Sequence, residues 1–269
     1  MSNILIIPDV HGRKFWRKCV ESNESKVDKI IFLGDYLDPY QAEIDDNKDL
    51  MECDHWTDSY HLSNMLNDII SLKKENPNKY VLLTGNHSDS YIWSKFSSAT
   101  RTDYEHWEQY HKIFSENLDY FNVCWIEDDV IFSHAGITED WADDFLYSSM
   151  KYDEGAELEK GSLVFETARV LKDTPLKNFN KYYIDSISHI SHHRGGNYFH
   201  GSCEWADLIE HVDIDKSTPE NIVANGRKGI YQIFGHTQLK QALINDKWAC
   251  LDCRKGFIIN TKTFDINEC

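Results

Sequence analysis

Near its start the chain reads Ile4-Leu5-Ile6-Ile7-Pro8-Asp9-Val10-His11, a run of β-forming residues joined directly to a carboxylate and an imidazole. Four later segments repeat this arrangement of an apolar run that ends in Gly and polar residues, at 29–38, 80–87, 130–136 and 230–237. Short apolar runs of this kind predict buried strands. Because loops at the ends of neighbouring strands are held beside one another, the polar residues of the five segments are predicted to converge on one site.

These loops would present side chains whose oxygen and nitrogen atoms can bind metal ions. The five motifs that contain these side chains are Asp9-Val10-His11, Gly34-Asp35-Tyr36-Leu37-Asp38, Gly85-Asn86-His87, Ser133-His134-Ala135-Gly136 and Phe234-Gly235-His236-Thr237. Carboxylate and imidazole ligands without a thiolate suit Mn, Fe or Zn better than they suit a structural zinc site rich in Cys. A carboxylate such as Asp35 can bridge two cations roughly 3.5–4 Å apart, which together clamp a phosphoryl group. The sequence therefore predicts a dinuclear metal site.

As an ordered set, these motifs resemble the calcineurin-like metallophosphoesterase superfamily, and they look closest to its serine/threonine phosphoprotein phosphatase and diadenosine-tetraphosphatase branch. The resemblance extends from Asp9 to the strand after Asp252. Many members of the superfamily end the last motif with Gly-His-x-His, whereas this chain has Gln238 in place of the second His. The resemblance implies an α/β fold of the αββα type, a two-sheet β-sandwich flanked by helices.

The resemblance also implies which residues hold the metals and what the metals do. Two divalent ions are expected, Mn²⁺ first, with Fe and Zn as alternatives that accept the same ligands. A hydroxide that bridges the two ions would be the nucleophile. Asp35 would bridge the ions, and the implied ligands are Asp9, His11, Asp35, Asn86, His134 and His236.

His87 is implied as the general acid that protonates the leaving-group oxygen, and Asp38 as the carboxylate that orients it. For the phosphoryl oxygens, Arg194 is the first candidate, because its guanidinium suits phosphate and the glycines after it allow close approach. Arg13 is the second candidate. The chain departs from phosphoprotein phosphatases at Pro39, where they carry a phosphate-binding Arg, and at Ser88, where they carry Glu.

The predicted activity is hydrolysis of a phosphomonoester, on a phosphoprotein or a small metabolite. One alternative is a phosphodiesterase or dinucleoside-polyphosphate hydrolase that uses the same site. An alternative from another class is a binding or regulatory module that retains metals without turnover. The presence of both His87 and Asp38 favours an enzyme.

At 269 residues and 41% hydrophobic composition, the chain is expected to form a single domain, 1–269. Helical spacing predicts helices over 13–23 and 54–74, and the aromatic-rich segment 89–119 is predicted to pack in the core. Residues 138–228 are expected to form a largely helical insertion, the candidate cap over the metals. The apolar stretches 230–234, 241–244, 248–251 and 257–260 predict strands of the second sheet.

The net charge of −17 argues against binding to extended duplex nucleic acid, which requires a basic surface. Bound metals would reverse the sign locally, so a phosphorylated small molecule or phosphoprotein is the expected partner. No apolar run approaches the roughly 20 residues that cross a bilayer, and no signal peptide precedes the first strand, so no membrane partner is expected. Seven scattered cysteines do not suggest a disulfide framework. The expected compartment is the cytoplasm.

Overall fold

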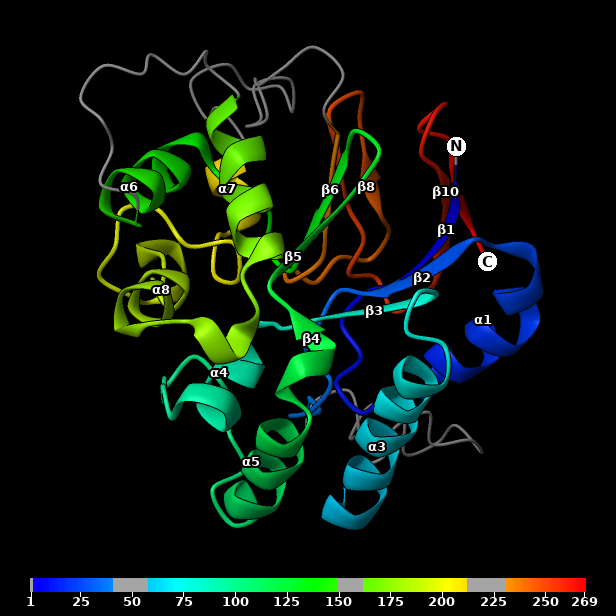
Figure 1. Ribbon diagram of the computed structural model, residues 1–269, viewed down its shortest axis with the longest axis horizontal. Helices are drawn as coiled ribbons and strands as arrows, with labels where there is room; N and C mark the ends of the chain where they lie inside the picture. Colours follow the sequence, from blue (N-terminus) through cyan, green and yellow to red (C-terminus); the bar gives the residue numbers. More distant parts are fainter. Residues whose placement is uncertain (1, 41–57, 150–161, 212–230) are drawn as a thin grey trace. The chain divides into compact units, whose positions relative to one another are not determined.

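A computed structural model of the chain describes residues 2–40, 58–149, 162–211 and 231–269 (Figure 1). The chain divides into two compact units, of which unit 1 comprises residues 1–121 and 254–269 and unit 2 comprises residues 122–253. Parts of the segments predicted as a helix at 54–74 and as a cap at 138–228 lie outside the described residues. The single-domain organisation and the cap both stay predictions.

Unit 1 is built on a mixed sheet whose strands have the order β11-β10-β1-β2-β3-β4. The three strands β1, β2 and β3 are parallel, and their apolar side chains are almost fully buried. This burial explains why the sequence of each strand is a continuous apolar run. The bounds are β1 Asn3–Ile7, β2 Lys29–Phe32, β3 Tyr80–Leu83, β4 Phe121–Asn122, β10 Phe257–Asn260 and β11 Ile266–Glu268.

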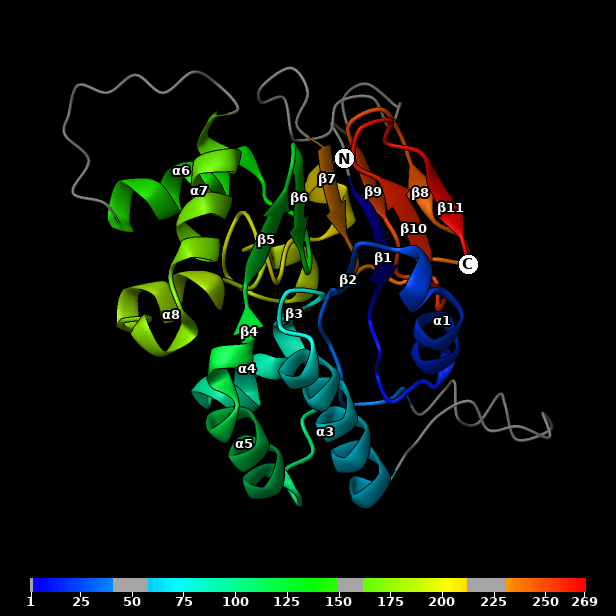
Figure 2. The same cartoon turned by 45° about the vertical axis from the view of Figure 1, so that its right-hand side comes forward.

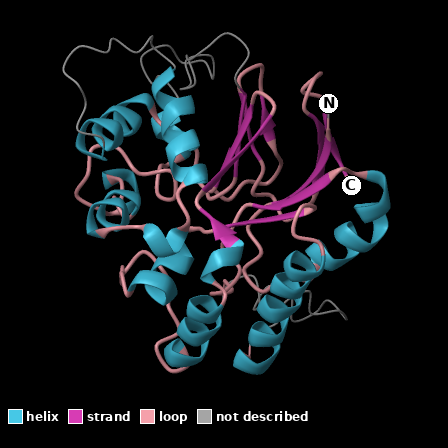
Figure 3. Cartoon of the chain, viewed as in Figure 1, coloured by secondary structure: helices cyan, strands magenta, loops and turns pink. Residues whose placement is uncertain are grey.

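Helices of unit 1 connect the strands and pack beside them (Figure 3). The longest, α3, buries residues at helical spacing, from Leu62 through Leu66 to Ile69 and Ile70. Its first turn is capped by the Asp58 carboxylate, which accepts from the backbone N–H of His61 at 3.0 Å. The bounds are α1 Phe15–Asn23, α3 Ser59–Glu75, α4 Asn86–Trp93 and α5 Trp107–Glu116.

Unit 2 is built on a second mixed sheet with the order β5-β6-β7-β9-β8. Helix α7 packs against β5 and buries Val164, Ala168 and Leu171, while α6 packs against both α7 and α8. The strands are β5 Cys124–Glu127, β6 Val130–Ser133, β7 Tyr231–Phe234, β8 Leu243–Ile244 and β9 Trp248–Cys250. The helices are α6 Glu139–Ser149, α7 Ser162–Asp173 and α8 Lys181–Ile187.

The predicted α/β fold, with two sheets flanked by helices, is confirmed, and the five apolar runs are strands β1, β2, β3, β6 and β7. The assignment of residues 257–260 to the second sheet is wrong. Strand β10 pairs antiparallel with β1, with Ile259 opposite Ile4, and β11 continues that sheet (Figure 2). In the part of the chain that the structure describes, no helix has the length and apolar character that crossing a membrane requires.

Gly34, between β2 and Asp35, occupies a position that admits no side chain. Its φ is +114°, and a Cβ there would lie 2.6 Å from the carbonyl oxygen of Thr84. We expect Gly34→Ala to lower the free energy of unfolding by clearly more than the about 1–2 kcal/mol that a left-handed backbone alone costs. Chemical denaturation of the metal-free protein measures this change.

Gly195→Ala is the matched control, because Gly195 also has a positive φ of +83° but has no atom within 4 Å of an added Cβ. In this control variant, the free energy of unfolding should fall only by the amount that the left-handed backbone costs an alanine. Equal losses of stability in the two variants would show that contact with Thr84 is unimportant.

Candidate metal centre

Three parallel strands deliver the polar residues of unit 1 to one edge of the sheet. The loop after β1 is joined to the loop after β2 by backbone hydrogen bonds, in which the N–H of His11 donates to the Asp35 carbonyl at 2.7 Å and that of Gly12 to the Tyr36 carbonyl at 3.0 Å. The loop after β3 joins them, because the N–H of His87 donates to Asp35 Oδ1 at 3.0 Å. The strand order therefore brings together motifs that are far apart in the sequence.

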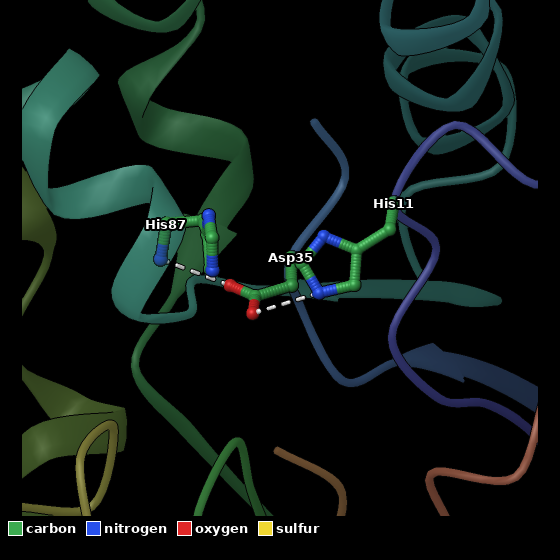
Figure 4. A group of neighbouring side chains, drawn as sticks. All are labelled: His11, Asp35 and His87. Atoms are coloured by element: carbon green, nitrogen blue, oxygen red, sulfur yellow. Dashed lines mark hydrogen bonds and ion pairs between the residues drawn. The ribbon is translucent and has the colours of Figure 1, made fainter. Parts of the chain in front are cut away.

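His11, Asp35 and His87 form a buried cluster in unit 1 (Figure 4). Each offers one ligand atom, and these three atoms lie within 4.8 Å of one another. The Nε2 atom of His11 lies 3.4 Å from Asp35 Oδ2, and the rings of His11 and His87 meet edge to face at 4.8 Å. The side chains of His11 and Asp35 are only 1% and 2% exposed.

The hydrogen bond of His11 defines which ring nitrogen is available. Its Nδ1–H donates to the Leu37 carbonyl at 2.8 Å, which leaves the Nε2 lone pair directed toward Asp35. Burial is the main cause that lowers the pKa of His11, and the Asp35 carboxylate opposes that effect. A neutral imidazole whose second nitrogen is held by a backbone carbonyl is the usual form of a metal ligand.

His87 lies against Asp38, the carboxylate that the resemblance pairs with it. The Nδ1 of His87 lies 2.8 Å from Asp38 Oδ2, and both side chains are buried. The other carboxylate oxygen of Asp38 accepts from the Tyr91 hydroxyl at 2.5 Å, and that hydroxyl accepts from the backbone N–H of Asp103 at 2.9 Å. Burial, followed by the charge of Asp38, raises the pKa of Tyr91. Tyr91 thus holds the carboxylate that orients His87.

Sequence reasoning assigned Tyr91 to the core and missed this role. A signal was present, because Tyr91 follows His87 by four residues on helix α4 and therefore lies on the same helical face. The aromatic side chain is 0% exposed, so the core assignment holds for its ring. Only the hydroxyl of Tyr91 contacts the Asp38 carboxylate, to which it donates a hydrogen bond.

Tyr91→Phe should lower kcat by about tenfold, the scale of one hydrogen bond to a charged group, without lowering metal content. The reason is that Asp38 would lose the donor that fixes its carboxylate. Steady-state kinetics and metal analysis of the purified variant measure both quantities. Tyr110→Phe is the matched control, since this buried tyrosine lies 5.3 Å from the Tyr91 ring and its hydroxyl has no hydrogen-bond partner among the described residues. A kcat for Tyr91→Phe equal to that of the control would exclude the positioning role.

Four predicted site residues have left-handed backbone. Their φ angles are 42° at His11, 46° at Asp35, 60° at Asp38 and 64° at His236. Such angles are uncommon for residues other than glycine, although Asp and His tolerate them better than most. Backbone strain of this kind concentrates where the surrounding structure holds functional side chains in place.

Unit 2 brings His134 and His236 together. They follow the parallel neighbours β6 and β7, and the N–H of Gly235 donates to the His134 carbonyl at 2.7 Å. His134 Nε2 lies 3.2 Å from His236 Nδ1, so one of these nitrogens carries the proton and the other accepts it. His134 is fully buried and His236 is 7% exposed.

Of the remaining predicted residues, Asp9 and Arg13 lie between β1 and α1, Asn86 begins α4, and Arg194 ends a short 3-10 helix, His192–Arg194. Asp9 and Asn86 are buried, but Asp9 is not one of the three residues of unit 1 whose ligand atoms cluster. Arg13 is also buried and donates to the Asp9 carbonyl at 2.9 Å. In unit 2, Arg194 donates to the Thr237 hydroxyl at 2.7 Å and pairs with Asp207 at 2.6 Å. The phosphate-binding roles of Arg13 and Arg194 stay predictions.

The donor set suits divalent metal ions. Within the described residues, unit 1 gathers two imidazoles and a carboxylate in a buried position, and unit 2 separately gathers two imidazoles. Burial of polar and charged groups is costly unless they are paired or coordinate a metal. Nitrogen and oxygen donors without a thiolate match Mn, Fe or Zn.

A model of the calcineurin-like phosphoesterase family matches residues 2–238, a range that contains every predicted site residue. A comparison with curated protein sequences found no matching relative. The family match thus extends over both units of the chain.

A comparison with solved structures found similar chains. A cold-active protein-tyrosine phosphatase from the psychrophile Shewanella sp. matches 100% of this chain and 80% of its own, with a TM-score of 0.55 and 11% identity. A protein serine/threonine phosphatase from Saccharomyces cerevisiae matches 96% of this chain and 72% of its own, with a TM-score of 0.46 and 12% identity. A putative diadenosine tetraphosphatase matches 100% of this chain and 93% of its own, with a TM-score of 0.44 and 13% identity. The first match shows similarity of fold alone.

Proposed function

Since the chain belongs to the calcineurin-like phosphoesterase family, we propose that it hydrolyses a phosphomonoester, on a phosphoprotein or a small metabolite, with two divalent metal ions. The observation that carries the proposal is the buried His87–Asp38 pair beside His11 and Asp35. This arrangement supports the proposal, because a candidate proton donor lies next to candidate metal ligands. Metal-assisted hydrolysis of a phosphate ester with an alkoxide leaving group uses both.

Six residues would hold the metals, with Mn²⁺ as the expected ion and Asp35 as the bridging ligand. Bound divalent metals supply an activated water as nucleophile and positive charge for the phosphoryl oxygens. Both oxygens of Asp35 already face polar groups, the His87 N–H and His11 Nε2. The proposed ligands are Asp9, His11, Asp35, Asn86, His134 and His236.

His87 would give a proton to the leaving oxygen of the substrate. Its Nδ1–H donates to the Asp38 carboxylate, which leaves Nε2 as the atom that would transfer the proton. Tyr91 fixes the far side of that carboxylate. An alkoxide is a poor leaving group in water, so protonation by His87 is the step that a natural phosphomonoester needs.

The test compares p-nitrophenyl phosphate with bis-p-nitrophenyl phosphate, using metal-stripped protein titrated with Mn²⁺. Preference for the monoester, with activity that rises with bound Mn²⁺, supports the proposal and points next to phosphopeptides. Preference for the diester would overturn it in favour of a phosphodiesterase or dinucleoside-polyphosphate hydrolase. Absence of turnover on either compound by Mn²⁺-loaded protein would favour a binding module.

A further inference from the structure

Arg101 is an exposed residue that the loop between α4 and α5 brings to the cluster of unit 1. The residues on each side of it, Thr100 and Thr102, are buried, and their hydroxyl oxygens lie 3.0 Å apart. The hydroxyl of Thr100 also donates to the Ser97 carbonyl at 2.9 Å. The backbone at Arg101 is therefore anchored, while its side chain is accessible.

Two sets of contacts hold the Arg101 guanidinium. Its Nε and Nη2 both donate to the carbonyl oxygen of Asp38, at 3.2 and 2.8 Å. Its planar group stacks on the ring of Tyr40, with the central carbon 3.4 Å from the ring centroid. One edge and one face of the guanidinium are thus fixed, which is an unusual degree of order for an exposed arginine.

The position of Arg101 relates it to the candidate metal ligands. Its Nη2 lies 3.5 Å from His11 Nδ1, and the Tyr40 ring that supports it meets the His11 ring edge to face at 4.9 Å. Because His11 Nδ1–H donates to Leu37, the two nitrogens are neighbours rather than hydrogen-bond partners. Arg101 therefore places a permanent positive charge directly beside the cluster.

That charge has no acidic side chain opposite it within the part of the chain that the structure describes. In the same described part, Nη1 makes no hydrogen bond, so two donors on the outer edge of the guanidinium are available. Arg194 differs, because Asp207 neutralises it. On a chain with a net charge of −17, a fixed and unneutralised cation beside buried ligands is suited to attract an anionic group.

We propose that Arg101 is a substrate-binding residue whose Nη1 edge holds an oxygen of the substrate's phosphoryl group beside His11. The inference rests on the proposed function and names a residue of the same site that its motifs do not contain. Guanidinium matches phosphate because its donors lie in one plane and its charge persists at every physiological pH. The bonds to Asp38 and the stacking on Tyr40 orient that plane before substrate arrives.

The experiment measures binding of inorganic phosphate to Mn²⁺-loaded protein by calorimetry, and KM and kcat for p-nitrophenyl phosphate. Arg101→Met, which keeps the length of the side chain, should raise the phosphate Kd and KM by about tenfold or more, the effect of losing a charge-assisted hydrogen bond. Its kcat should also fall, because a guanidinium on a phosphoryl oxygen stabilises the charge of the transition state. Arg101→Lys keeps the charge and should give an intermediate Kd.

Arg17→Met is the matched control. Arg17 is also exposed, lies over an aromatic ring at 5.1 Å from Trp16 and contacts an acceptor, Asp68, at 2.6 Å, but it is on helix α1. Its replacement should leave the phosphate Kd unchanged. Metal content and the unfolding midpoint, measured on all three variants, identify any general loss of structure.

Two results would overturn the inference. The first is a phosphate Kd for Arg101→Met equal to that of the unmodified protein. The second is a lower kcat with unchanged KM and Kd, which would mean that Arg101 only holds the Asp38 loop. These outcomes differ from failure of the proposed function, because a protein that binds phosphate through Arg101 without hydrolysing any ester would support the inference and refute the activity.

Discussion

Replacement of His87 with Ala should lower kcat for a phosphoserine peptide by about 10²–10⁴-fold, the usual contribution of a general acid. The loss on p-nitrophenyl phosphate should be far smaller. The physical reason is the leaving group, because a serine alkoxide must be protonated as it departs, whereas p-nitrophenolate is stable without a proton. The ratio of the two losses, measured on one preparation, isolates the proton transfer from all other effects of the substitution.

The control for this prediction is His61→Ala. His61 also pairs through Nδ1 with a carboxylate, that of Asp58 at 2.7 Å, but the pair is exposed on helix α3. Both variants should retain the Mn²⁺ content of the unmodified protein. Because His87 also belongs to the cluster of possible ligands, loss of Mn²⁺ from His87→Ala would identify it as a ligand and contradict the general-acid role.

Asp35→Asn should lower both Mn²⁺ content and kcat, the latter by at least about a hundredfold, since even an outer partner of a metal ligand contributes 10–100-fold. The amide keeps the size of the side chain but removes the charge that a bridging ligand brings to both ions. His236→Ala should remove one of the two ions, because it replaces a ligand of the second metal alone. Elemental analysis after gel filtration gives the stoichiometries.

Asp28→Asn is the control for the loss of one carboxylate, since Asp28 is exposed and accepts from the Asn3 backbone N–H at 2.8 Å, away from the cluster. Its metal content should equal that of the unmodified protein. If Asp35→Asn and His236→Ala each lost the same number of metal ions, that result would contradict a bridging role for Asp35. Full occupancy and full activity in both variants would refute the ligand set.

The sequence predicts the centre of each sheet better than its edges. Strands β1, β2 and β3 are buried on both faces, so their residues form continuous apolar runs that local patterns reveal. The partner of β1 at its other side is β10, more than 250 residues away, and an apolar stretch does not specify which distant strand it joins. The error at 257–260 therefore reflects non-local pairing.

The same distinction applies to the site. His11, Asp35, Asp38 and His87 are detectable because each lies in the loop after a strand or in the first turn of the next helix. Tyr91 was detectable only as a neighbour of His87 on a helical face. Arg101 has no local signal, because its relation to Asp38 arises from a loop 63 residues further along the chain. Side chains that act through tertiary contacts require coordinates.

The left-handed backbone at His11, Asp35, Asp38 and His236 has a consequence for protein engineering. At such positions glycine or asparagine relieves conformational cost, so a search for thermostable variants of the metal-free chain will favour those residues. Each such exchange would remove an imidazole or a carboxylate from the candidate site. If the four residues act as proposed, thermostability and activity are opposed at the same positions. Libraries built on this scaffold then need selection for bound metal and turnover together with melting temperature.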